Sequence, residues 1–156
     1  ILLIGPGGAG KAVSAYLLKS LKNKNNLFIT GRAKNSEIFC KRIACEFLEW
    51  NNYENFLEEF DIIINCTSLG SGNFKNLSPI SSGGFNKIKK NVLIFDIIYD
   101  PSPSKLLSSG IKRGFKTLDG KKMNLLQASL AFDYCINDNK NFNTYDLMFE
   151  KFNKLS

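Results

Sequence analysis

The glycine-rich turn near the amino terminus limits the possible folds of this chain more than any other feature. Four apolar residues open the chain, and the sequence Gly5-Pro6-Gly7-Gly8-Ala9-Gly10 follows them directly. Apolar residues then recur with helical spacing from Ala12 to Leu18. A short strand, a glycine turn of the form G-x-G-x-x-G and a helix, in this order, are typical of the first unit of a dinucleotide-binding fold.

The three glycines of this motif are each expected to meet a different need. Gly5 permits the sharp exit from the strand, Gly7 lets the backbone approach a pyrophosphate, and Gly10 lets the helix pack closely on the strand. The anion would lie at the helix amino terminus, where open N–H groups and the helix dipole favour negative charge. The motif is not a P-loop, because Lys11 follows Gly10 directly and Ala12 offers no hydroxyl for magnesium. A glycine turn that serves packing alone is the alternative.

Strand and helix patterns alternate along the whole chain. Six strands are predicted, at residues 1–4, 27–30, 47–48, 61–65, 92–99 and 115–118. The unbroken β-branched run in the fourth of them favours a strand that is buried on both faces of a parallel sheet. Ser36 is expected to be the N-cap of the second helix. The pattern predicts an α/β fold, a Rossmann-like doubly wound parallel sheet with helices on both faces, formed as one domain by residues 1–156.

Composition and charge exclude several other classes of protein. The net charge is +7, but the lysines are scattered among asparagines, so no nucleic-acid partner is expected. No apolar run approaches the roughly 20 residues that span a bilayer, so no membrane partner is expected either. The chain has no histidine, and its four cysteines lack C-x-x-C spacing, so no metal site is expected and the thiols are interpreted as reduced and cytoplasmic. Ile1 lies inside the first strand, which indicates a piece of a longer protein.

The loop after the second strand is where such a fold selects its cofactor. Enzymes that use NAD usually carry an acid at this position, whereas an arginine accommodates the 2′-phosphate of NADP. Here Arg32 and Lys34 occupy the loop, and no acidic residue occurs before Glu37. Arg32 is therefore expected to lie against the adenosine phosphate, and NADP is the predicted cofactor. Solvated loop charges without a ligand are the alternative.

Polar residues after the fourth strand, Thr67 and Ser68, are candidates to touch the cofactor, because the carboxyl ends of parallel strands face the ligand crevice. Simple capping of the strand's exit turn is the alternative for both. Met123 and Gln127 stand four residues apart, so they share one face at the start of a later helix. Gln127 interrupts an apolar helical face and is expected to meet a polar partner or ligand, with a plain surface position as the alternative.

Four motifs in sequence order resemble the NADP-binding domain of shikimate dehydrogenase, and the resemblance covers nearly the whole chain. They are Gly5 to Ala12, Asn65 to Gly70, Phe95 to Pro101 with Leu106-Leu107, and Asp119 to Met123 with Gln127-Ala128. Members of the family reduce 3-dehydroshikimate to shikimate with NADPH in aromatic amino acid biosynthesis. The resemblance implies the same oxidoreductase activity here.

The resemblance also implies roles for particular residues. Gly5, Pro6, Gly7, Gly8 and Ala9 would hold the pyrophosphate. Gly31, Arg32, Ala33, Lys34, Asn35 and Ser36 would hold the 2′-phosphate, and Ile97, Gly120 and Met123 would line the nicotinamide end. Tyr99 and Gln127 would touch the substrate. The catalytic lysine and aspartate of the family belong to an N-terminal substrate domain that is absent here, so no catalytic residue is assigned in this chain. The chain alone would therefore be inactive. The protein would be a monomer or homodimer.

Three residues depart from the family pattern. Pro6 stands where a small residue is common, Gly31 replaces the usual asparagine, and Asn124 replaces an apolar residue. Two other functions remain open: a quinate/shikimate dehydrogenase that uses NAD, and a non-catalytic NADP(H)-binding or interaction module. The non-catalytic module predicts that the last helices cover their apolar residues within the chain, whereas the enzyme predicts an exposed surface at Tyr99, Gln127 and part of residues 125–134.

Overall fold

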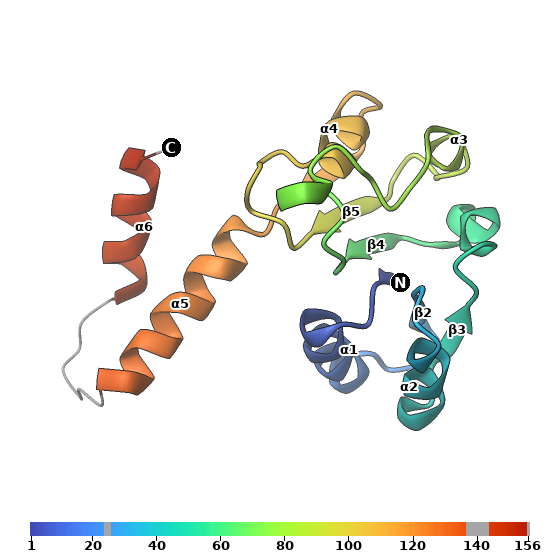
Figure 1. The fold of residues 1–156 in the computed structure, drawn as a ribbon, viewed down its shortest axis with the longest axis horizontal. Helices are drawn as coiled ribbons and strands as arrows, with labels where there is room; N and C mark the ends of the chain where they lie inside the picture. Colours follow the sequence, from blue (N-terminus) through green and yellow to red (C-terminus); the bar gives the residue numbers. More distant parts are fainter. Residues whose placement is uncertain (24–25, 137–143, 156) are drawn as a thin grey trace. The chain divides into compact units, whose positions relative to one another are not determined.

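The computed structural model describes residues 1–23, 26–136 and 144–155. Internal contacts divide the chain into two compact units, Ile1–Asp119 and Gly120–Ser156. The first, called the sheet unit below, contains every strand in the described part of the chain (Figure 1). The second, called the helical unit, contains two helices in its described residues. The expectation that residues 1–156 form one domain stays a prediction.

A six-stranded sheet forms the centre of the sheet unit. Its strands are β1 (Leu2–Ile4), β2 (Phe28–Thr30), β3 (Glu46–Leu48), β4 (Ile62–Asn65), β5 (Leu93–Asp96) and β6 (Lys116–Leu118). Their order is β3-β2-β1-β4-β5-β6, and every neighbouring pair is parallel. The predicted doubly wound parallel sheet is therefore confirmed. Ile4 pairs with both Thr30 and Asn65, and Asn65 pairs with Asp96, so the carboxyl ends of these strands lie in line.

Alternate residues of the strands build two separate apolar cores, one on each face of the sheet. Leu2, Ile4 and Ile63 point to one core, while Leu3 and Ile64 point to the other. All five are fully or almost fully buried. This two-sided burial explains why β1 and β4 are apolar at every position except the last residue of β4, and it confirms the prediction made for the fourth strand.

The helices cover both faces of the sheet. In chain order they are α1 (Gly8–Ser20), α2 (Asn35–Ile43), the 3₁₀ helices η2 (Tyr53–Glu59) and η3 (Gly72–Phe74), α3 (Ser82–Phe85) and α4 (Lys105–Ile111). Residues of α1 and α2 pack on one core, and residues of η2, α3 and α4 pack on the other (Figure 1). This arrangement leaves the carboxyl ends of the central strands to the loops that follow them.

The prediction that Ser36 is the N-cap of α2 is wrong. The helix begins at Asn35, and Lys34 occupies the N-cap position without any side-chain cap. The chain turns earlier than expected, because the Ser36 N–H donates to the Ala33 carbonyl oxygen at 2.8 Å. The Ser36 side chain is consequently buried within the first turn.

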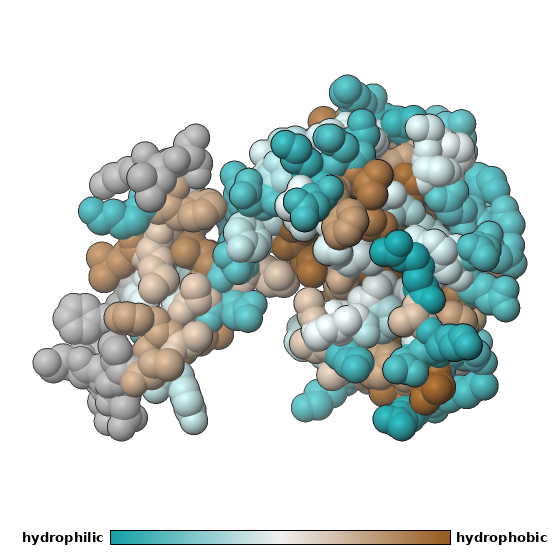
Figure 2. Space-filling view, in the orientation of Figure 1, coloured by the Kyte–Doolittle hydropathy of each residue, from teal (hydrophilic) through white to brown (hydrophobic). Residues whose placement is uncertain are grey.

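The helical unit consists of α5 (Lys121–Ile136) and α6 (Thr144–Leu155). Lys121 and Lys122 lie over the rings of Phe152 and Phe149, with Nζ 5.8 and 5.9 Å from the ring centroids. Large hydrophobic side chains are nevertheless exposed on these helices: Leu126, Leu130, Phe132, Tyr134 and Leu147. Figure 2 shows hydrophobic surface on this unit. Among the helices that the structure describes, none combines the length and the apolar character that a membrane crossing needs.

Candidate functional site

The glycine turn between β1 and α1 is shaped by close backbone packing. Gly5 has a φ of 95°, a conformation that favours glycine, and a Cβ atom there would lie 2.5 Å from Cγ2 of Thr67. A Cβ atom on Gly10 would lie 2.2 Å from the Gly5 carbonyl oxygen. The expected steric roles of Gly5 and Gly10 are thus confirmed. By contrast, a Cβ atom on Gly7 would have no described atom within 4 Å, so the backbone at Gly7 borders open space.

The amino terminus of α1 opens into this space. Gly7 is the N-cap residue, and no side chain caps the helix. Gly7, Gly8 and Ala9 are exposed. The first N–H groups of a helix have no intrahelical acceptors, so an anion bound here could receive hydrogen bonds from the backbone.

A pocket of about 310 Å³ lies beside the turn, and we call it the turn pocket. It is lined by Gly5, Pro6, Gly7, Gly31, Arg32, Ala33, Ser36, Trp50 and Thr67. Eight of these nine residues were expected to bind cofactor, and the fold brings them together from the ends of β1, β2, β3 and β4. Arg32 is the one charged residue among them, so the pocket is suited to a ligand that combines a negative charge with an uncharged part.

Arg32 is exposed at the edge of the turn pocket, and its guanidinium carbon lies 5.4 Å from the centroid of the Trp50 ring. Within residues 1–23, 26–136 and 144–155, no carboxylate forms an ion pair with it. Its charge is therefore available to an anionic ligand. Trp50 is not among the residues predicted from the sequence, although its position just after a strand end is a signal that could have found it.

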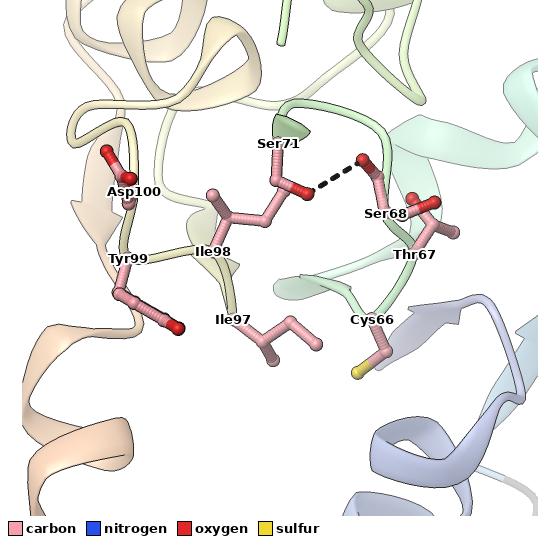
Figure 3. Close-up of a pocket in the computed structure, with 8 residues that line it drawn as sticks. All are labelled: Cys66, Thr67, Ser68, Ser71, Ile97, Ile98, Tyr99 and Asp100. Atoms are coloured by element: carbon pink, nitrogen blue, oxygen red, sulfur yellow. Dashed lines mark hydrogen bonds between the residues drawn. The ribbon is translucent and has the colours of Figure 1, made fainter. Parts of the chain in front are cut away.

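A second pocket, of about 410 Å³, lies between the segments that follow β4 and β5, and we call it the strand-end pocket. Figure 3 shows its lining residues: Cys66, Thr67, Ser68, Ser71, Ile97, Ile98, Tyr99 and Asp100. The expected residues Ser68, Ile97 and Tyr99 face it from both sides. Thr67 lines both pockets, so the two sites are adjacent along the carboxyl edge of the sheet.

A buried hydrogen-bond network fixes the two walls of the strand-end pocket. The side-chain amide of Asn65, at the end of β4, donates to Oδ1 of Asp96 at 3.0 Å. Oδ1 of Asn65 accepts hydrogen bonds from the N–H and the hydroxyl of Thr67, at 2.9 and 2.7 Å. Asn65 and Asp96 are both fully buried. The network thereby ties the turn after β4 to the adjacent strand β5.

Asp96 extends this network toward α4. Its two carboxylate oxygens accept from the Ile98 N–H at 3.1 Å and from the Ser104 hydroxyl at 2.6 Å. Ser104 in turn caps α4 by accepting from the Leu107 N–H at 3.2 Å. Burial raises the pKa of the Asp96 carboxyl, and this effect outweighs the hydrogen bonds from Ser104, Ile98 and Asn65, which lower it.

The remaining expected site residues lie outside the two sets of lining residues. Four of them are exposed and are close in sequence to residues that line the turn pocket: Gly8, Ala9, Lys34 and Asn35. Gly120, Met123 and Gln127 belong to the helical unit, where Gly120 is buried, Met123 is half-buried and Gln127 is exposed. Their roles toward cofactor and substrate stay predictions. In the described residues, no cluster of three potential metal ligands occurs.

A parallel sheet of order 3-2-1-4-5-6, with a glycine turn after its first strand and an open helix amino terminus, defines a dinucleotide-binding domain of the Rossmann class. No family model matches the sequence. A shikimate dehydrogenase (NADP(+)) of Clostridium botulinum (strain 657 / Type Ba4) is 34% identical over 138 residues, which cover 87% of this chain and 51% of that protein. One from Methanococcus maripaludis (strain S2) is 36% identical over 139 residues, which cover 85% of this chain and 48% of that protein.

The solved structures agree with these relatives. A shikimate dehydrogenase in complex with NADP+ superposes with a TM-score of 0.76 at 26% identity, over 96% of this chain and 53% of that chain. Over most of its length, the chain is therefore similar to shikimate dehydrogenases. It spans about half the length of the relatives that it matches.

Proposed function

We propose that this chain is the NADP-binding part of a shikimate dehydrogenase, an enzyme that reduces 3-dehydroshikimate to shikimate with NADPH. The observation that carries the proposal is Arg32, which lines the turn pocket and has no ion-pair partner in the described part of the chain. In a Rossmann domain, the residue at this position is the one expected to meet the adenosine ribose. The pocket has no acidic lining residue that could bond a ribose 2′-hydroxyl instead. The relatives named as NADP(+) enzymes support the same cofactor.

The residues present fit such a dinucleotide. Open space beside Gly7 and the uncapped start of α1 suit the pyrophosphate, and Gly31 to Ser36 suit the phosphorylated ribose. Thr67 and Ser68 would lie along the cofactor where the two pockets meet, and Ile97 would lie at the nicotinamide end, with Gly120 and Met123. The bound nicotinamide supplies the hydride, while the chain's own residues bind and orient it.

The substrate would be shared with an N-terminal domain that this chain lacks. We assign Tyr99 and Gln127 to the substrate side of the crevice, and both are exposed. The apolar residues exposed on α5 support an enzyme whose second domain covers them, rather than a free-standing binding module. The resemblance implies that the acid–base pair of the ketone reduction belongs to that domain, so the proposal assigns no catalytic residue to this chain. The whole enzyme would be cytoplasmic, as a monomer or homodimer.

Calorimetric titration of the chain with NADPH and with NADH tests the proposal. We expect selective binding of NADPH, and we expect Arg32→Ala to weaken NADPH binding by about ten- to a hundredfold, because charged hydrogen bonds to the phosphate are lost. NADH binding should change little. Arg42→Ala is the matched control, since it removes the same charge from the exposed last turn of α2.

Two results would contradict this assignment. An equal loss of NADPH and NADH affinity in Arg32→Ala would remove the 2′-phosphate role from Arg32. Preference of the unmodified chain for NADH would favour the NAD-using quinate/shikimate enzyme instead, and absence of binding to either nucleotide would favour a glycine turn that serves packing alone.

A further inference from the structure

Trp50 and Arg32 occupy equivalent places on neighbouring strands. Thr30 and Leu48 are paired residues at the carboxyl ends of β2 and β3, and each of the two side chains follows its strand end by two residues. The parallel register therefore delivers the indole and the guanidinium to the same edge of the sheet. Their separation of 5.4 Å is within the range in which a cation is attracted to an aromatic face.

The indole ring of Trp50 packs against the buried core through Tyr53. Its centroid lies 5.3 Å from that of the Tyr53 ring, and Tyr53 is only 2% exposed. The Tyr53 hydroxyl donates to the carbonyl oxygen of Pro79, which fixes this ring in turn. Trp50 is thus a half-buried platform anchored to the sheet unit, whereas Arg32 is an exposed side chain.

A guanidinium that lies on an aromatic face keeps its N–H edges free for a phosphate. The platform also restricts the positions of a long side chain, so less conformational entropy is lost when the phosphate binds. On these grounds, and resting on the proposed function, we propose that Trp50 is a positioning residue that holds Arg32 ready for the adenosine 2′-phosphate. Trp50 then contributes to the selectivity for NADP over NAD through Arg32 and not through a contact of its own.

A comparison of adenosine 2′,5′-bisphosphate with ADP separates a role of Trp50 toward the 2′-phosphate from a general role in nucleotide binding, because only the bisphosphate carries a 2′-phosphate. We expect Trp50→Ala to weaken binding of the bisphosphate by about three- to tenfold, the range expected for loss of one cation–π contact, and to change ADP binding by less than about twofold. Trp50→Phe should restore the selectivity, because it keeps an aromatic face, and Trp50→Leu should not, although it keeps apolar bulk. In Arg32→Ala, the further change Trp50→Ala should have no additional effect on selectivity.

These measurements distinguish three outcomes: a variant that does not fold, a wrong cofactor assignment, and a wrong role for Trp50. Thermal unfolding of each variant identifies any that is not folded, and Trp50→Leu and Trp50→Phe then carry the comparison. Equal weakening of both ligands would mean that Trp50 stacks on the base or supports the pocket generally, and equal selectivity in Trp50→Leu and Trp50→Phe would mean that the aromatic face is irrelevant. Either result overturns the inference. If the unmodified chain does not prefer the bisphosphate, the proposed cofactor itself is wrong.

Discussion

The two adjacent pockets are built in different ways. The turn pocket is shaped by the backbone, since glycines at positions 5 and 10 allow approaches that any side chain would block. The strand-end pocket is shaped by side chains, since Asn65 and Asp96 join the ends of two strands through buried hydrogen bonds. Steric fit therefore defines the first site and a polar network defines the second. They meet at Thr67, whose methyl group abuts Gly5 and whose hydroxyl belongs to the network.

The difference also explains two of the departures from the family pattern. A Cβ atom on Gly31 would lie 2.6 Å from Cδ of Pro6 and 2.6 Å from Oγ of Ser36. The proline ring thus occupies the space in which a side chain at position 31 would begin. The Pro6 ring and the glycine at position 31 are therefore sterically compatible, and a side chain at position 31 would require the ring to move. Nothing in the structure explains Asn124.

The largest expected effect comes from breaking the network at Asp96. Asp96→Ala would leave the Asn65 amide, the Ile98 N–H and the Ser104 hydroxyl without their buried acceptor, so we expect the free energy of unfolding to fall by about 3 kcal/mol or more. Asp96→Asn keeps an acceptor and should cost clearly less. Urea denaturation measures both variants. The control is Asp61→Ala, which removes an exposed carboxylate paired with Lys89 and should have little effect.

Equal destabilisation by the alanine and asparagine variants would show that the network contributes nothing specific at Asp96. The strand-end pocket would then depend on apolar packing alone, and the contrast with the turn pocket would disappear.

A smaller effect is expected from filling the space at Gly31. Gly31→Ala should lower the free energy of unfolding by about 1–2 kcal/mol, because the added methyl group overlaps the rigid Pro6 ring. Pro6→Ala in the same chain should recover most of this loss, since the Ser36 hydroxyl can rotate away and the ring is gone. The coupling energy of this double-mutant cycle is the measurement. Additive losses would mean that the two departures are independent.

The contrast between the pockets also marks how far the sequence could predict this site. The glycine turn, the six strands and the Arg32 loop are local patterns, and each was predicted from a short stretch of residues. Trp50 was not, because its role depends on the register between β2 and β3, which brings it beside Arg32. Asn65 and Asp96 are likewise 31 residues apart and meet only in the folded sheet. The wrong N-cap at Ser36 has a local cause instead, because the chain already turns at Ala33, whose carbonyl oxygen accepts from the Ser36 N–H.

The smallest expected effect is a dependence of the free energy of unfolding on pH, which arises from the burial of Asp96 in the strand-end network. Because burial raises the pKa of Asp96, the folded chain retains a proton at pH values where the unfolded chain, with an aspartate pKa of about 3.9, has lost it. The contribution of Asp96 to stability is therefore fully present below the unfolded pKa. It falls as the pH rises through the folded pKa, and it is constant above the folded pKa. Its slope cannot exceed about 1.4 kcal/mol per pH unit. Urea denaturation of the unmodified chain and of Asp96→Asn between about pH 4 and 7 isolates this slope as the difference between the two curves. A difference of the opposite sign would show that the hydrogen bonds to Asp96, which favour the carboxylate, outweigh the effect of burial, which favours the neutral acid.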